Sequence, residues 1–375
     1  MAPRHLVVSA VNFSEGGPLT VLLDSLDAAV RVLGPEWRIT ALVHDSDLIN
    51  IPGVKTIAFP QSKRSWLTRL RLEWREFRLL SAQWKPDLWL SLHDMTPRVI
   101  ARRQAVYCHN PSPFYRASLV EARYDPRFFL FNKFYMLLYR AFIARNFAVI
   151  VQQSWIRDAF RKVTGHPHIV VARPGAADAT DRRDAVDAQC SALRTPQPGR
   201  PLRLLYPALP RVFKNAETLC EAVSRLPDHL ASSVDLRLTF DGTENGWARE
   251  LARRYNGVRG ISLIGRQDRS GMTAEYQRCD AVLFPSRLET WGLPITEAKS
   301  FGKPLLAADL PYAHETVGDY GNVRFVPADD VGAWTEEIAH MASGRWEPQD
   351  HQAIRPSAPY LDDWPSLWRY LAAGL

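Results

Sequence analysis

Short apolar runs alternate with amphipathic stretches along most of the chain. His5–Phe13 is a mostly apolar run that leads to Gly16-Gly17, Leu19–Leu33 has apolar residues at helical spacing, and Arg38–His44 is apolar again. Further apolar runs, separated by helical segments, follow at Asp87–Leu92, Ala105–Cys108, Phe147–Val151 and Ile169–Ala172. Strands that alternate with helices in this way predict a parallel, doubly wound α/β sheet.

The alternation stops in the segment from Asp178 to Pro201, which is rich in charge, Pro and Gly, and it resumes at Leu202. The second series of expected strands reads LRLLYP, DLRLTFDG, ISLIGR, AVLFPS and PLLAAD. We therefore expect a Rossmann-like domain at 1–180, a linker at 181–201 and a second Rossmann-like domain at 202–358.

The last segment, 359–375, is expected to contain a helix with one apolar face. That face requires a partner surface, and we expect the helix to pack back on the N-terminal domain. Its apolar residues are Trp364, Leu367, Trp368 and Leu371. Two α/β domains in tandem predict a central cleft at the carboxyl ends of their strands, where ligands of such sheets bind.

Composition narrows the class of protein. The 375 residues are 46% hydrophobic and 23% charged, a globular balance that disfavours a structural or disordered protein. The four cysteines form no CxxC pair, so neither a zinc site nor a disulfide framework is indicated. No apolar run approaches the roughly 20 residues needed to span a bilayer. We expect a cytoplasmic protein, either free or peripheral on the inner membrane face.

The net charge of +7 is concentrated in the N-terminal half, where residues 1–185 hold 26 Lys and Arg against 16 Asp and Glu. The stretch from Lys63 to Lys85 predicts a basic amphipathic helix. Three interpretations remain open: a solvated helix whose tryptophans pack in the core, a surface for a membrane or an anionic acceptor, and a nucleic-acid surface. The candidate acceptor or membrane residues are Arg69, Arg71, Arg75, Arg78, Trp66 and Trp74.

Two glutamates, Glu289 and Glu297, flank the sequence TWGLPIT. Pro294 is expected to open a helix that contains Glu297 in its first turn, and Gly302 is expected to close it. The turn before Pro294 brings Glu289 back over the helix N-terminus, which is a ready-made anion site. This arrangement suits a ligand with a phosphate in its middle and hydroxyls at both ends.

The run from Arg278 to Gly321 resembles the C-terminal signature of glycosyltransferase family 4, whose members are retaining enzymes with the two-domain GT-B fold. The family pattern of a glutamate, seven residues and a second glutamate corresponds to Glu289 and Glu297. The resemblance implies that Glu297 binds the ribose of a nucleotide sugar and that Glu289 binds the donor hexose. Neighbouring donor contacts are implied for Thr290, Trp291, Gly292 and Leu293.

Three further sequences resemble parts of the family layout. Gly16 and Gly17 resemble the glycine loop whose backbone approaches the diphosphate, and Lys214-Asn215 fits the lysine that binds the donor phosphates. The arginine that usually precedes this lysine does not fit cleanly, so Arg211 is either its substitute or a surface residue. His109, in VYCHNPSPF, corresponds to the histidine beside the reacting sugar. The expected catalytic residues are thus His109, Glu289 and Lys214.

Departure of a nucleoside diphosphate leaves negative charge on phosphate oxygens, and the Lys214 ammonium and backbone amides are expected to stabilise it. No essential metal or other cofactor is therefore predicted, and Asp45 and Asp47 are interpreted as a polar loop. Retention is implied by the resemblance. We expect front-face attack, with the departing phosphate taking the acceptor proton and His109 positioning the sugar or phosphate.

The resemblance implies a hexosyltransferase that uses a UDP- or GDP-linked sugar. The expected acceptor is a lipid-linked or other oligosaccharide of bacterial-type cell-surface polysaccharide or lipopolysaccharide assembly. The expected partners include an anionic membrane surface and exclude nucleic acid. Two alternatives are a non-catalytic sugar- or polyanion-binding module on a degenerate GT-B fold, and a sugar-nucleotide epimerase.

Overall fold

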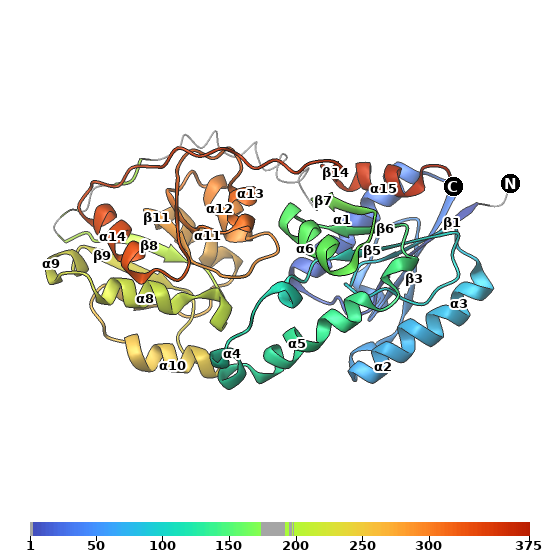
Figure 1. Ribbon diagram of the computed structural model, residues 1–375, viewed down its shortest axis with the longest axis horizontal. Coiled ribbons are helices and arrows are strands. Elements are labelled where there is room, and N and C mark those ends of the chain that lie inside the picture. The colour runs from blue at the N-terminus through green and yellow to red at the C-terminus, as the bar shows by residue number, and fades with distance from the viewer. Residues whose placement is uncertain (1–2, 174–191, 195–196, 198) are drawn as a thin grey trace. The chain divides into compact units, whose positions relative to one another are not determined.

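A computed structural model of the protein describes residues 3–173, 192–194, 197 and 199–375. Contacts divide the chain into two compact units, which are described separately. The N-terminal unit contains Met1–Phe114, Phe134–Arg182 and Pro356–Leu375, and the C-terminal unit contains Tyr115–Lys133 and Arg183–Arg355. The ribbon of each unit is an α/β sheet covered by helices (Figure 1).

The N-terminal unit is built on an eight-stranded sheet in which all neighbouring strands are parallel. In spatial order the strands are β14 (Tyr360–Leu361), β7 (Ile169–Ala172), β6 (Ala148–Val151), β5 (Arg103–Cys108), β4 (Leu88–Ser91), β1 (Arg4–Ala10), β2 (Trp37–Val43) and β3 (Val54–Ala58). Every residue of β4, β6 and β7 is buried, as expected for central parallel strands covered on both faces.

Helices cover both faces of this sheet. They are α1 (Gly16–Leu33), α2 (Trp66–Arg71), η3 (Leu72–Glu76), α3 (Phe77–Trp84), α5 (Pro126–Arg140), which continues into the C-terminal unit, α6 (Ser154–Thr164) and α15 (Trp364–Ala372). On β1, Leu6 and Val8 pack with α1 and α15 on one face. Val7 points to the other face and packs with Leu72 and Phe77.

The C-terminal segment completes the N-terminal unit. Helix α15, red in Figure 1, lies against α1, and β14 pairs with β7. Trp368 is fully buried, and its indole N–H donates to the carbonyl of Ser25 at 2.8 Å. Arg103 donates to the carbonyls of Leu371 and Ala373, both at 2.7 Å, and so caps the carboxyl end of α15.

The C-terminal unit has a six-stranded parallel sheet. Its spatial order is β10 (Ile261–Leu263), β9 (Val234–Leu238), β8 (Leu202–Tyr206), β11 (Ala281–Phe284), β12 (Leu305–Ala308) and β13 (Val323–Val326). Its helices are α4 (Leu119–Tyr124), α8 (Ala216–Ser224), α9 (Asp228–Ala231), α10 (Gly246–Tyr255), α11 (Arg269–Arg278), α12 (Leu293–Ser300), α13 (Pro311–Val317) and α14 (Val331–Ala342). Short 3₁₀ turns complete the chain: η1 (Ser46–Leu48), η2 (Pro60–Lys63), η4 (Ser112–Phe114), η5 (Ile143–Arg145) and η7 (Val212–Lys214).

The predicted fold class, two doubly wound parallel-sheet domains, is confirmed. The predicted boundaries differ from the observed units because Tyr115–Lys133 clusters with the C-terminal unit. Most of the predicted linker at 181–201 lies outside the described residues. Within the described ranges, no helix is long and apolar enough to cross a membrane.

Candidate functional site

Lys214 and Glu289 form an ion pair in the C-terminal unit. Lys214 ends η7, which follows β8, and its Nζ lies 2.5 Å from Oε1 of Glu289 in the loop after β11. The two side chains are only 20% and 12% exposed. Tyr206 fixes the lysine backbone because its buried hydroxyl donates to the Lys214 carbonyl. An ammonium has three N–H donors, so the pair leaves Lys214 with further donors for a phosphate.

Glu297 contacts a different partner. It lies on α12, and its Oε2 accepts from the hydroxyl of Tyr276 at 2.6 Å. Burial raises the pKa of Tyr276 well above its usual value, so the hydroxyl stays protonated and donates. The Tyr276 ring stacks on Phe301, with 5.3 Å between centroids. A carboxylate accepts about four hydrogen bonds, so this single bond leaves acceptor positions for ligand hydroxyls.

The loop between the glutamates has the predicted break. Gly292 adopts φ +79° immediately before α12, and a Cβ there would lie 3.3 Å from Ile295 Cδ1 and 3.4 Å from Phe284 Cε1. The Trp291 indole N–H donates to Thr296 at 3.0 Å, which ties the loop to the helix. Because α12 begins at Leu293, Glu297 lies in its second turn and not in the first as expected.

Asn215 holds three loops together. Its side chain is 1% exposed and donates to the carbonyls of Pro285 at 3.1 Å and Ala328 at 2.7 Å, while its oxygen accepts from Thr218 at 2.7 Å. Its backbone N–H is bonded to the Val212 carbonyl. Both polar groups of this amide have partners within the protein, so the structure shows Asn215 joining the loops, and its donor contact stays a prediction.

Arg211 is engaged elsewhere in the C-terminal unit. Its Nη2 lies 2.6 Å from Oδ2 of Asp125, and its guanidinium lies 5.3 Å from the ring of Phe128 and 5.6 Å from that of Phe213. The structure therefore favours the surface interpretation of Arg211 over the phosphate-binding one. Arg287, two residues before Glu289, was not among the predicted site residues. Its backbone N–H donates to the Phe213 carbonyl at 2.8 Å beside Lys214, and its guanidinium pairs with Asp329 at 2.5 Å.

Gly16 and Gly17 begin α1 after the β1 loop. Gly16 has φ +65°, which favours glycine, and a Cβ added at either glycine would meet no atom within 4 Å. Space of this kind permits a ligand to approach the backbone. Phe13, in the same loop, packs edge-on against His109 at 5.5 Å between centroids, so the glycine loop and the predicted histidine lie close together.

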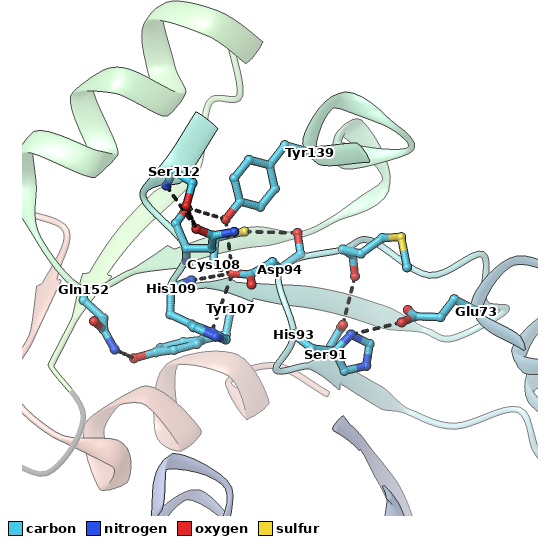
Figure 2. Close-up of polar contacts among 12 residues, drawn as sticks. Glu73, Ser91, His93, Asp94, Tyr107, Cys108, His109, Ser112, Tyr139 and Gln152 are labelled. Carbon is cyan, nitrogen blue, oxygen red and sulfur yellow. Dashed lines mark hydrogen bonds and ion pairs between the residues drawn. The ribbon is translucent and has the colours of Figure 1, made fainter. Parts of the chain in front are cut away.

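His109 follows β5 and is organised by Asp94, which the sequence analysis missed (Figure 2). Asp94 Oδ1 accepts from the backbone N–H groups of His109 at 2.7 Å and Asn110 at 3.0 Å and from the hydroxyl of Tyr139 at 3.1 Å. The His109 ring Nδ1 lies 3.5 Å from the same oxygen. The signal in the sequence was an acidic residue just beyond the carboxyl end of the buried β4, where α/β sheets bind ligands.

The predicted basic helix exists, but one of its arginines faces inward. Residues 66–84 are helical through α2, η3 and α3. Arg69 is 8% exposed and pairs with the fully buried Glu73 at 3.2 Å. This corrects the assignment of Arg69 to an acceptor or membrane surface. Trp66 is 46% exposed, whereas the half-buried Trp74 packs edge-on against Phe142 at 5.4 Å.

The remaining arginines of the helix border a shallow pocket of about 600 Å³ on the N-terminal unit. Arg71, Arg75 and Arg78 are exposed. They are joined by one arginine from the loop after β4 and by apolar side chains of the helix; the lining residues are Leu70, Arg71, Trp74, Arg75, Arg78, Leu79 and Arg98.

No cluster of three potential metal ligands occurs within the part of the chain that the structure describes. Asp45 caps the turn η1 by accepting from the Asp47 backbone N–H at 3.1 Å, which is the behaviour of a polar loop.

Comparisons with known proteins agree with this architecture. Residues 195–356 match the family model of glycosyl transferases group 1. A glycogen synthase of Mycobacterium tuberculosis is 31% identical over 163 residues, which are 42% of this chain and 39% of the relative. A D-inositol 3-phosphate glycosyltransferase of Corynebacterium urealyticum is 26% identical over 178 residues, 45% of this chain and 40% of that protein. The chain thus spans about two fifths of the length of these relatives.

Two solved structures extend the likeness over both units. The crystal structure of WaaG, a glycosyltransferase involved in lipopolysaccharide biosynthesis, covers 98% of this chain and 94% of its own, with a TM-score of 0.58 and 13% identity. The crystal structure of Anabaena Alr3699/HepE in complex with UDP and glucose is also similar. The match covers 91% of this chain and 94% of the HepE chain, with a TM-score of 0.54 and 14% identity. The chain therefore has the GT-B fold, and residues 195–356 are similar to the glycosyl transferases group 1 family.

Proposed function

We propose that the protein is a retaining hexosyltransferase that uses a UDP- or GDP-linked sugar. The observation that carries the proposal is the arrangement of Lys214, Glu289 and Glu297 within the segment that matches the family model: a half-buried ion pair on one side of a glycine turn and a second carboxylate on the following helix. The similar HepE structure is a complex with UDP and glucose, which supports a nucleotide-sugar donor.

The proposed roles follow from the polar groups. Glu297 accepts hydrogen bonds from the ribose hydroxyls, and Glu289 accepts them from the hexose. The Lys214 ammonium and the amides of residues 290–293 stabilise the charge that develops on the departing diphosphate, with no essential metal. The departing phosphate takes the proton of the acceptor hydroxyl, the new glycosidic bond forms on the same face, and His109 contacts the transferred sugar.

A non-catalytic sugar-binding module is the second candidate, and the pairing of Arg211 with Asp125 favours it because no arginine is then assigned to the phosphates. Incubation with a panel of nucleotide sugars separates the two candidates. The transferase releases UDP or GDP from one hexose donor with overall retention, whereas the module binds without turnover. Interconversion of two sugar nucleotides without nucleotide release would instead identify an epimerase.

The Glu297→Ala variant is expected to weaken nucleotide binding. Loss of charged hydrogen bonds to the ribose costs about 1.5–3 kcal/mol, roughly ten- to a hundredfold in Kd. At a hundredfold excess over the dissociation constant, a nucleotide stabilises the wild-type protein by about 2.7 kcal/mol. A thermal-shift titration with UDP and GDP measures the change and identifies the base.

The Glu289→Ala variant is expected to behave differently from Glu297→Ala. It should keep the thermal shift with UDP or GDP and lose turnover with the hexose donor. Glu336, an exposed residue of α14, is the matched control: Glu336→Ala should change neither quantity. Wild-type nucleotide binding in the Glu297 variant would contradict the ribose assignment.

We further propose a lipid-linked glycan acceptor of cell-surface polysaccharide assembly and peripheral association with the cytoplasmic face of an inner membrane. The pocket bordered by Arg71, Arg75, Arg78 and Arg98 supports this proposal, because its cations surround the apolar side chains of Leu70, Trp74 and Leu79. An anionic headgroup with an apolar chain is complementary to that surface.

The triple variant Arg71→Gln/Arg75→Gln/Arg78→Gln is expected to lose binding to anionic liposomes. Each arginine near an anionic surface contributes about 1 kcal/mol, so the three together change partitioning by about a hundredfold. Sedimentation with anionic and with neutral vesicles, at low and high salt, measures it. The control replaces three exposed arginines of the C-terminal unit, Arg259, Arg269 and Arg345, with Gln. Equal binding by the two triple variants would refute the assignment.

A further inference from the structure

A buried charged cluster in the N-terminal unit has no part in the proposed chemistry. It consists of Arg69 and Glu73 on the basic helix and His93 in the loop after β4. Arg69 Nη2 donates to the His93 carbonyl at 3.0 Å, and Glu73 Oε1 lies 3.1 Å from His93 Nδ1. Glu73 and His93 are fully buried, and burial raises the pKa of Glu73 to about 7 while it lowers that of His93.

Burial of charge at this position is expensive for stability. Desolvation costs several kcal/mol for each ion, and well-packed apolar residues of similar volume stabilise a core at least as well. The cluster is therefore poorly explained as a device for stability alone. It connects two elements, the helix and the loop after β4, and it fixes that loop through one backbone carbonyl and one side chain.

The helix is also distorted at the cluster. Residues 72–76 form a π turn in which the Phe77 N–H bonds to the Leu72 carbonyl instead of that of Glu73. The Glu73 carbonyl accepts instead from the backbone N–H of Arg98 at 3.1 Å. The π turn thus provides a second attachment to the loop after β4, since both the carboxylate and the carbonyl of Glu73 contact residues of that loop. Single π turns often occur at functional sites.

The attached loop contains Asp94, which adopts φ +67°. A residue other than glycine in this conformation costs about 1–3 kcal/mol and persists only where its surroundings enforce it. The neighbouring residue His93 is held by the cluster. The backbone N–H of Asp94 donates to the Tyr107 carbonyl at 3.1 Å. Asp94 Oδ1 in turn holds the backbone of His109 and Asn110.

We infer that Arg69 and Glu73 are positioning residues that act through His93 and Asp94 on His109. Figure 2 shows most of the chain of contacts, from the Glu73 carboxylate to the His93 ring and from the Asp94 carboxylate to the start of the segment after β5. The consequence for turnover rests on the proposed function, because it requires His109 to contact the transferred sugar. The effect on the geometry of His109 does not.

The test compares Glu73→Gln with Glu76→Gln. Both residues lie in the same π turn and both substitutions replace a carboxyl group with an amide of the same size, but Glu76 is partly exposed and pairs with Arg71. Imidazole NMR signals of histidine-labelled protein, assigned with His109→Ala, report the surroundings of His109. We expect Glu73→Gln to shift the His109 signals and Glu76→Gln to leave them in place.

Turnover is measured as hydrolysis of the donor without an acceptor, so that acceptor docking does not enter. We expect Glu73→Gln to lower kcat by about ten- to a hundredfold, the effect of a misplaced catalytic group, with an unchanged UDP or GDP thermal shift. In a His109→Ala background the same substitution should have no further effect, because the two residues act as one unit.

The two measurements separate the two ideas. Unchanged His109 signals in a folded Glu73→Gln protein would overturn the positioning role whatever the enzyme does. Shifted signals with unchanged turnover would support the positioning role and remove His109 from the reaction. If Glu73→Gln does not fold, Arg69→Lys replaces it in the test. This variant keeps the positive charge but loses the planar guanidinium that reaches both Glu73 and the His93 carbonyl. Unchanged His109 signals in the Arg69→Lys protein would likewise overturn the positioning role.

Discussion

The Lys214→Ala variant is expected to lower turnover with the nucleotide sugar by about a hundredfold or more, the effect of removing one preorganised donor from a developing anion. The ammonium is held by Glu289 at 2.5 Å and by a backbone that Tyr206 fixes, so its position is set before a ligand binds. Steady-state release of UDP or GDP, measured beside the thermal shift, separates lost turnover from lost binding.

The ion pair makes a second variant necessary. Lys214→Ala also leaves Glu289 without its partner, and the uncompensated carboxylate could repel the diphosphate. In the double variant Lys214→Ala/Glu289→Gln that negative charge is absent, so a loss of turnover beyond that of Glu289→Gln alone belongs to the missing ammonium. Lys162→Ala, at an exposed position of α6, is the control. A folded Lys214→Ala protein with near-normal turnover would remove Lys214 from the site.

The Trp368→Ala variant is expected to lower the free energy of unfolding of the N-terminal unit by about 3–5 kcal/mol. The indole is fully buried between α15 and α1, and its replacement leaves a cavity and removes the hydrogen bond to the Ser25 carbonyl. Urea denaturation, followed by circular dichroism, measures the loss.

Arg369→Ala changes the next residue of the same helix, which is exposed, and should alter stability by less than about 0.5 kcal/mol. Equal stability of the Trp368 and Arg369 variants would show that α15 is dispensable for the N-terminal unit.

The sequence predicts most of the sheet because central parallel strands are buried on both faces and read as continuous apolar runs. The strands it missed lack that signal. β3 reads VKTIA, an edge strand with no buried residue, and β14 is two half-buried residues beside a cis-proline segment. β13 is buried only at its two ends. For such strands the neighbouring strand, and not the local sequence, decides the conformation.

The sequence likewise predicts some residues of the candidate site and not others. The glutamate pair was visible because a glycine and a proline between Glu289 and Glu297 mark the turn that separates them. The inward direction of Arg69 was not inferred, although Arg69 and Glu73 share a helix face with the buried Phe77. The available signal was a pair of opposite charges, Arg69 and Glu73, at helix positions where the spacing to Phe77 would lead one to expect apolar residues. Asp94 depends on a left-handed backbone that no local pattern specifies.

The return of the chain to its first sheet has a consequence for biosynthesis. The hydrogen bond between Trp368 and Ser25 joins residues 343 positions apart, and the whole C-terminal unit lies between them in the sequence. During translation most of the N-terminal unit emerges first, yet the apolar face that α15 covers stays open until α15 itself has been made after the long intervening segment. Because closing so long a loop is slow, the C-terminal unit can finish folding first, and the nascent N-terminal sheet must be kept from aggregating in the meantime.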